Sequence, residues 1–93
     1  MDITVNHDTE NQEFTVDLDG GEQAELAYAL PQPNVIDFTH TFVPKESRNQ
    51  GVANRLIETG LQHAEEQGYK VIATCQAVAK FVRTHESYQR LLL

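Results

Sequence analysis

Hydrophobic and polar residues alternate along the first half of the chain, as in strands that bury one face of a sheet. Four such segments occur, around residues 3–5, 14–18, 24–30 and 35–43. The connections between them are short, which predicts an antiparallel meander. In the fourth segment, alternation places four side chains on one face: Ile36, Phe38, His40 and Phe42.

The hydrophobic period changes in the second half of the chain. Apolar residues recur at helical spacing, at Val52, Ala53, Leu56, Ile57, Leu61 and Ala64. Gly68 is a stop signal for this helix, and Gly60 inside it indicates close packing against a sheet. An apolar run at 71–73, ending at Cys75, predicts a strand buried on both faces. Residues 77–82 return to helical spacing.

These elements predict an α+β fold in a single domain over residues 1–93. The antiparallel meander is followed by a parallel β-α-β unit over 35–75 and by a C-terminal helix. In a β-α-β unit the carboxyl ends of the strands and the N-terminus of the helix lie at the same end, where ligands bind. Residues 47–53, SRNQGVA, are predicted to lie at this end.

Composition narrows the class of protein. The chain has 14 Asp and Glu against 7 Lys and Arg, a net charge of −7, which argues against nucleic-acid binding and is compatible with a cationic acceptor such as an amine. No apolar run approaches membrane-spanning length, and the N-terminus has no signal-like pattern. The single cysteine excludes an internal disulfide and suits a cytoplasmic location. No Cys/His cluster has metal-ligand spacing, so no metal is expected.

Residues 47–53 have two interpretations. The first turn of a helix carries free backbone N–H groups and the positive end of the helix dipole, which attract phosphate. Gly51 allows close approach, Ala53 keeps the next turn open, and Arg48 supplies a cation. Alternatively, Ser47 and Gln50 form a capping box ahead of an apolar run.

Three further sequence features accompany this loop. HTFVP at 40–44 precedes it, a cysteine closes the strand after the helix, and HESY at 85–88 supplies an H-x-x-Y. The loop itself, RNQGVA at 48–53, fits an R/Q-x-x-G-x-G/A pattern. In this order the motifs resemble the GNAT superfamily of acyl-CoA-dependent N-acetyltransferases, and its short single-domain GNAT-like members in particular, over about residues 14–92.

This resemblance implies a minimal GNAT-like fold in which the fourth and fifth strands splay and acetyl-CoA inserts its pantetheine between them. It assigns the cofactor contacts to Phe42, Val43, Arg48, Asn49, Gln50, Gly51, Val52 and Ala53. The amides of 50–53 would hold the pyrophosphate, and the main chain of 42–43 the pantetheine amides. The implied activity is acetyl transfer from acetyl-CoA to a small-molecule or protein amine. Because the chain lacks the additional helices of larger members, an open acceptor site is expected.

Two residues are candidates for the chemistry. His40 is either a structural strand histidine or, beside the thioester, the base that takes a proton from the amine. Cys75 is either a small buried hydrophobe or a thiol whose pKa is lowered at a helix N-terminus. In the second case it would protonate the departing CoA thiolate, or carry the acetyl group transiently; the first of these roles is preferred.

The other histidines have simpler interpretations. His85 and Tyr88 are spaced to share a helical face and to pack the C-terminus, and His7 and His63 are predicted to be solvated surface positions. Two other classes of function remain open. One is a CoA-binding sensor or accessory protein without transferase activity. The other is an interaction module in which residues 47–53 only cap a helix.

Overall fold

The computed structural model describes residues 3–93. Its strands and α-helices follow one another as β1 (Asn6–Asp8), β2 (Glu13–Asp17), β3 (Gln23–Gln32), β4 (Val35–Phe42), α1 (Val52–Gln67), β5 (Lys70–Ala73) and α2 (Gln76–Arg83). Three short 3-10 turns complete the order: η1 (Asp19–Gly21), η2 (Lys45–Ser47) and η3 (Glu86–Leu91). The predicted order of strands and helices is confirmed.

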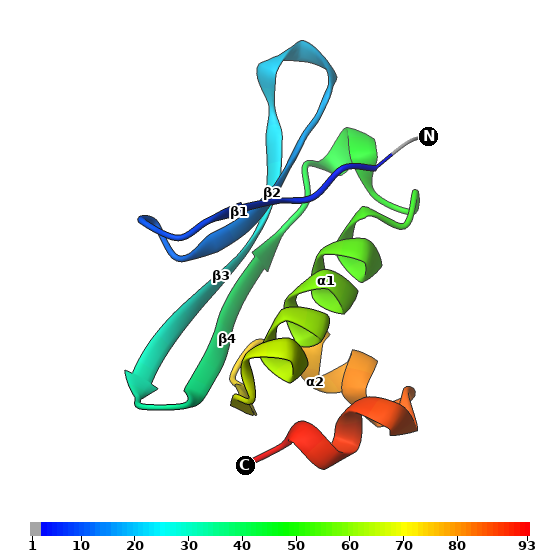
Figure 1. Ribbon diagram of the computed structural model, residues 1–93. Coiled ribbons are helices and arrows are strands. Elements are labelled where there is room, and N and C mark those ends of the chain that lie inside the picture. The colour runs from blue at the N-terminus through cyan, green and yellow to red at the C-terminus, as the bar shows by residue number, and fades with distance from the viewer. Residues whose placement is uncertain (1–2) are drawn as a thin grey trace.

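The five strands form one sheet in the order β1-β2-β3-β4-β5. The first three pairs are antiparallel and the β4–β5 pair is parallel, with α1 as the connection between those two strands (Figure 1). The predicted meander and β-α-β unit are therefore both present. The predicted first strand is displaced: Ile3 and Val5 precede β1 and pack, half-buried, against the core.

Helix α1 packs on one face of the sheet through a stripe of fully buried residues that includes Leu56 and Leu61. Gly60 lies in this stripe. A Cβ at that position would lie 2.9 Å from Leu26 Cδ2 and 2.9 Å from Phe38 Cε1, closer than side-chain contacts allow. The glycine therefore lets the helix backbone approach the sheet, as its position in the sequence predicted.

Strand β4 contains a β-bulge that changes which side chains share a face. Tyr28 on β3 pairs with Phe38, but the preceding residue, Ala27, pairs with His40. Thr39 is thus an extra residue on β4, and its Oγ1 donates a hydrogen bond to the Ala27 carbonyl at 3.3 Å. A bulge of this kind leaves two residues on one strand opposite one on its partner.

The predicted common face of Ile36, Phe38, His40 and Phe42 is therefore wrong beyond Phe38. Ile36 and Phe38 are fully buried under α1, whereas His40 and Phe42 lie on the opposite face of the sheet and are exposed. Thr41 takes the position on the α1 side, in register with Leu26. Alternation alone could not show this reversal, because it assumes no inserted residue.

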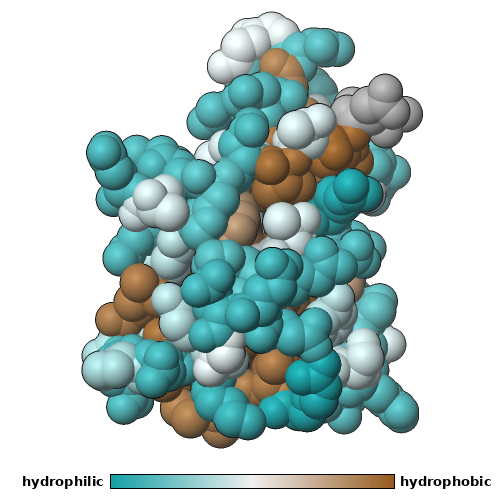
Figure 2. Space-filling view, in the orientation of Figure 1, coloured by the Kyte–Doolittle hydropathy of each residue, from teal (hydrophilic) through white to brown (hydrophobic). Residues whose placement is uncertain are grey.

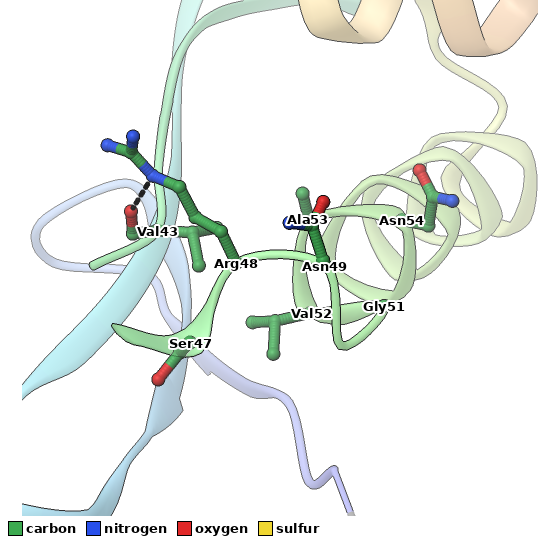
Figure 3. Close-up of a pocket in the computed structure, with 8 residues that line it drawn as sticks. All are labelled: Val43, Ser47, Arg48, Asn49, Gly51, Val52, Ala53 and Asn54. Carbon is green, nitrogen blue, oxygen red and sulfur yellow. Dashed lines mark hydrogen bonds between the residues drawn. The ribbon is translucent and has the colours of Figure 1, made fainter. Parts of the chain in front are cut away.

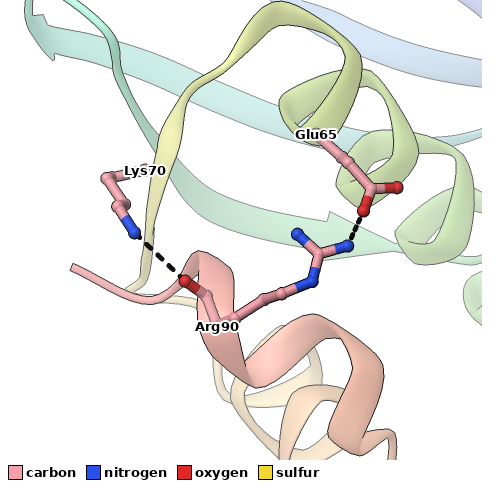
Figure 4. A network of polar contacts seen from close by, with 3 residues as sticks. All are labelled: Glu65, Lys70 and Arg90. Atoms are coloured by element: carbon pink, nitrogen blue, oxygen red, sulfur yellow. Dashed lines mark hydrogen bonds and ion pairs between the residues drawn. The ribbon is translucent and has the colours of Figure 1, made fainter.

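The C-terminal turn η3 is tied to both α1 and β5. Arg90 forms an ion pair with Glu65 of α1, and Lys70 Nζ of β5 donates a hydrogen bond to the Arg90 carbonyl at 3.1 Å (Figure 4). Leu91 is buried in the core, and the Leu93 amide donates to the carbonyl of Val71 at 2.9 Å. These contacts close the open edge of β5.

The surface on the side of α1 is mostly hydrophilic, with small separate apolar areas (Figure 2). Within residues 3–93, no helix is both long enough and apolar enough to cross a lipid bilayer.

Candidate functional site

Helix α1 begins without a side-chain cap. Its first helical residue is Val52 and its N-cap is Gly51, and no side chain of the described chain caps it. Ser47 is the last residue of η2, and Gln50 Nε2 donates instead to the Glu46 carbonyl at 3.5 Å. The capping-box interpretation is therefore wrong, since neither of its two residues reaches the start of the helix.

The uncapped first turn borders a cavity of about 350 Å³. The cavity lies between the end of β4 and α1, and Figure 3 shows its lining residues: Val43, Ser47, Arg48, Asn49, Gly51, Val52, Ala53 and Asn54. The first N–H groups of an α-helix have no intrahelical partner and carry the positive end of its dipole. This cavity therefore has the polarity that a phosphate group requires.

The backbone of the loop explains its glycine. Gly51 has φ +82° and Asn49 has φ +67°, both in the left-handed region that glycine, and less readily asparagine, adopts. A Cβ at Gly51 would meet no atom within 4 Å. Backbone conformation, not packing, thus requires glycine here, and the space over the helix start is open to a ligand.

Arg48 joins the two segments that the sequence assigned to the cofactor. Its Nε donates a hydrogen bond to the carbonyl of Val43 at 3.0 Å (Figure 3). The chain just after Phe42, at the end of β4, is thereby linked to the loop that precedes Gly51. Six of the eight predicted cofactor residues line the cavity at the start of α1, whereas Phe42 lies on the face of the sheet opposite α1 and Gln50 is not among the lining residues.

A second cavity, of about 290 Å³, lies on the other side of the same helix start, between α1 and α2. It shares Ala53 and Asn54 with the first cavity and includes Lys80 of α2. The first turn of α1 is therefore open on two sides, with a cationic side chain on each: Arg48 on the first and Lys80 on the second.

Cys75 lies where β4 and β5 separate. The last ladder pair is Phe38 with Ala73, and the Cys75 amide adds one more hydrogen bond, to the Phe38 carbonyl at 2.8 Å. Beyond it, the thiol is 3.2 Å from the hydroxyl of Thr41. This side-chain contact also links the two strands past their regular pairing.

The environment of Cys75 changes its acidity. Burial raises the pKa of the thiol, but the hydrogen bond with Thr41 and the backbone N–H groups of Val78, Ala77 and Thr41 outweigh it, so that the pKa is lowered overall. The sulfur makes no capping hydrogen bond to α2, of which Cys75 is the N-cap residue. The α2 amides therefore act as nearby dipoles, consistent with the acidity expected at a helix N-terminus.

Thr41 was not predicted from the sequence. It becomes a partner of Cys75 because the bulge turns it to the α1 side of β4, and alternation gave no signal of that bulge. His40, in contrast, lies on the other face and is exposed. The two predicted catalytic residues thus flank β4 from opposite faces of the sheet.

His7 and His63 were expected to be solvated surface positions; His7 is exposed, as expected, whereas His63 is half-buried, and the rings of both make aromatic contacts. The His7 ring stacks on Phe14 with centroids 4.2 Å apart, meets the His63 ring edge-on at 4.6 Å, and its Nε2 hydrogen-bonds to the Tyr28 hydroxyl at 2.6 Å. Burial, and then the neighbouring His63, lower the pKa of His7. The two histidines join β1 to α1 through an aromatic cluster.

His85 and Tyr88 pack the C-terminal region, as predicted. The His85 ring stacks on Phe81 of α2 with centroids 3.8 Å apart, and its Nδ1 is 2.7 Å from the Phe81 carbonyl. The Tyr88 ring also lies near the Phe81 ring, with the two centroids 6.2 Å apart.

Over the part of the chain that the structure describes, no three His, Cys, Asp or Glu side chains are grouped to hold a metal ion.

These features define a class of protein: a mixed sheet whose parallel pair separates beside an uncapped helix start that can receive an anion. Known proteins with this arrangement are found by sequence and by structure. The family model described as GCN5-related N-acetyl-transferase matches residues 13–91. The chain therefore belongs to the GCN5-related N-acetyl-transferase family, as its motifs indicated.

Individual relatives match nearly the whole chain. Protein NATD1 of Gallus gallus is 33% identical over 90 residues, which are 96% of this chain and 82% of the relative. Protein NATD1 of Homo sapiens is also 33% identical over 90 residues, 96% of this chain and 80% of the relative. The solution structure of a GCN5-like protein from Staphylococcus aureus superposes with a TM-score of 0.76 at 28% identity, over 97% of this chain and 87% of the other.

Proposed function

We propose that this protein is an N-acetyltransferase that moves an acetyl group from acetyl-CoA to an amine. One observation carries the proposal: α1 starts at a left-handed glycine with no side-chain cap, in a cavity that adjoins the end of β4. A helix start of this kind suits the pyrophosphate of coenzyme A. Membership of the family supports the same activity.

The residues present fit this cofactor. The backbone amides of 50–53 would hold the pyrophosphate, with Arg48 beside them as a fixed cation. The main chain of Phe42 and Val43 would hold the amides of the pantetheine arm. The Val43 carbonyl accepts a hydrogen bond from Arg48 and has a second lone pair with which it could accept one from the arm. When bound, acetyl-CoA supplies an activated thioester.

The chemistry requires one proton acceptor and one proton donor. As the amine nitrogen bonds to the carbonyl carbon and the C–S bond breaks, His40 accepts the proton from nitrogen and Cys75 gives its thiol proton to the departing sulfur. A lowered pKa makes Cys75 a stronger acid than an ordinary cysteine. The two residues flank β4 from opposite faces of the sheet. His40 would therefore act on the amine from one side, and Cys75 would act on the leaving sulfur from the other.

A CoA-binding protein without transferase activity remains the alternative. It shares the donor site and differs only in turnover. The third class was an interaction module in which residues 47–53 only cap the helix. It is no longer supported, because Ser47 and Gln50 do not cap α1. The one cysteine, present as a free thiol, supports a cytoplasmic location.

Substitution of the two candidate residues tests the proposal. His40→Ala should lower kcat on an amine panel by roughly 10²–10⁴, with acetyl-CoA binding unchanged, and should remove the acidic limb of the pH–rate profile because only neutral imidazole accepts a proton. Cys75→Ser should slow transfer modestly. His63→Ala, a histidine away from β4, is the matched control and should leave kcat within about twofold.

Other experimental results would each contradict a particular part of the proposed function. Wild-type protein that binds acetyl-CoA but acetylates no amine would favour the alternative, a sensor. Wild-type rates in both variants would mean that neither residue is catalytic. Rapid stoichiometric acetylation of Cys75 in the absence of acceptor, measured by mass spectrometry, together with loss of all transfer in Cys75→Ser, would replace direct transfer by a covalent route.

A further inference from the structure

The face of the sheet opposite α1 is largely open to solvent along β1 to β4. By strand register it carries Asp8 on β1, Glu13, Thr15 and Asp17 on β2, Gln23, Glu25, Ala27 and Ala29 on β3, and Asp37, His40 and Phe42 on β4. We call these residues the uncovered face. Thr15 is buried beneath longer neighbours, and the others are half-buried or exposed, so the surface faces solvent.

The uncovered face is predominantly acidic, and Lys70 of β5, in register with Val35, lies at its β5 edge. Every carboxylate that the five strands contain lies on it, and none lies on the α1 side. Residues 1–44 hold nine Asp and Glu and no Lys or Arg, whereas residues 45–93 hold five Asp and Glu and all seven Lys and Arg. Most of the acids are therefore in the first half of the chain, and all of the Lys and Arg residues are in the second half.

The centre of this face has room for one long side chain. Ala27 pairs with Glu13 on one side and with His40 on the other. Since neighbouring strands lie about 4.8 Å apart, Glu13 and His40 are about 10 Å apart across the small alanine. In the next row, Glu25 is flanked by Phe42, which is 43% exposed. An aliphatic stem can lie on the phenyl ring while its ammonium reaches the carboxylates.

Within residues 3–93, no Lys, Arg or His forms an ion pair with the carboxylates of this centre. The pKa of Glu13 is raised, first by a hydrogen bond shared with the Glu25 carboxyl, then by burial and by the negative charges of Glu25 and Asp8. Like charges side by side on neighbouring strands weaken a sheet. A cationic partner would remove this repulsion, so charge complementarity points to a positively charged occupant.

We propose that the uncovered face binds a basic segment of another protein and presents one of its lysines to His40 as the acceptor amine. The inference rests on the proposed function and names its substrate class. The carboxylates spread over four strands, about 15 Å across, on a surface without a deep pocket, whereas the pronounced cavities lie at other residues. Small ligands prefer concave sites, and a broad shallow face suits a macromolecular partner.

A peptide-binding experiment tests this inference without requiring turnover. The probe is a fluorescently labelled, end-blocked peptide with a central lysine flanked by three arginines on each side, and the reference peptide has serines in place of the arginines. Fluorescence anisotropy at low ionic strength measures their dissociation constants in the presence of CoA. The variant is Glu13→Gln/Glu25→Gln, which should fold because it removes a repulsion. The control is Glu58→Gln/Glu66→Gln, which removes the same charge from exposed positions of α1.

The inference predicts tight binding of the arginine-flanked peptide only, at least about fivefold weaker binding in Glu13→Gln/Glu25→Gln, and no change in the control. Equal losses in both variants would reduce the effect to net charge and overturn it. Unchanged affinity in both variants would also overturn the inference, as would equal binding of the serine-flanked peptide. Displacement of the peptide by spermine at equal or lower concentration would assign the face to a small polyamine instead. Calorimetry with CoA tests the donor site separately: CoA binding without peptide binding would refute this inference alone.

Discussion

Single residues at the centre of the sheet decide which chemistry is possible. Thr39 is inserted into β4, and this insertion sends His40 to one face and Thr41 to the other. The sequence was sufficient to choose the two candidate residues, a histidine before the loop and a cysteine after the next strand. Their surroundings could not be predicted, because the alternation pattern is shifted by one residue at the bulge.

At the residue scale, the prediction concerns the contact between Thr41 and Cys75. Thr41→Val keeps the shape of the side chain but removes the hydroxyl that contacts Cys75, so the pKa of Cys75 should rise and its thiolate should form at higher pH. Thr41→Ser keeps the hydroxyl and should behave like wild type. Thiolate absorbance or alkylation rate as a function of pH measures the shift. An unchanged titration in a folded Thr41→Val protein would show that the hydrogen bond has no part in the acidity.

At the scale of elements, periodicity predicted almost the whole fold. Helix α1 and its stop at Gly68, the four-stranded meander and the parallel β5 all follow from apolar spacing and turn residues. The sequence allowed two interpretations of the start of α1, because Ser47 and Gln50 fit a cap by sequence but not in space. A cap depends on loop geometry, and left-handed residues at Asn49 and Gly51 redirect this loop.

Gly60 provides a prediction for packing between α1 and the sheet. Alanine usually stabilises a helix interior by up to about 1 kcal/mol relative to glycine. Here its Cβ would meet Leu26 and Phe38, which are both fully buried, so Gly60→Ala should instead destabilise the protein by about 1–3 kcal/mol. Urea unfolding measures the change, with Gln62→Ala on the exposed side of α1 as the control. A gain in stability in Gly60→Ala would mean that the helix lies farther from the sheet.

At the scale of the whole molecule, the sheet would separate the two proposed binding sites. The cavities around the start of α1 include Arg48 and Lys80 in their lining, whereas every carboxylate of the strands lies on the uncovered face. An anionic donor and a cationic acceptor would approach from different sides and meet at β4. The overall charge of −7 is compatible with a cationic acceptor, but only the strand register places the carboxylates on one face.

The central claim is that coenzyme A binds at the first turn of α1, and isothermal titration calorimetry of CoA into wild type and Ala53→Glu tests it directly. Ala53 is in that turn and lines both cavities. A glutamate there suits the helix dipole, so the fold should be kept, but it would repel the pyrophosphate. The account predicts CoA binding to wild type and at least tenfold weaker binding to Ala53→Glu, about 1.4 kcal/mol, with no change in Gln62→Glu. Equal affinity in folded Ala53→Glu, or no binding to wild type, would contradict it.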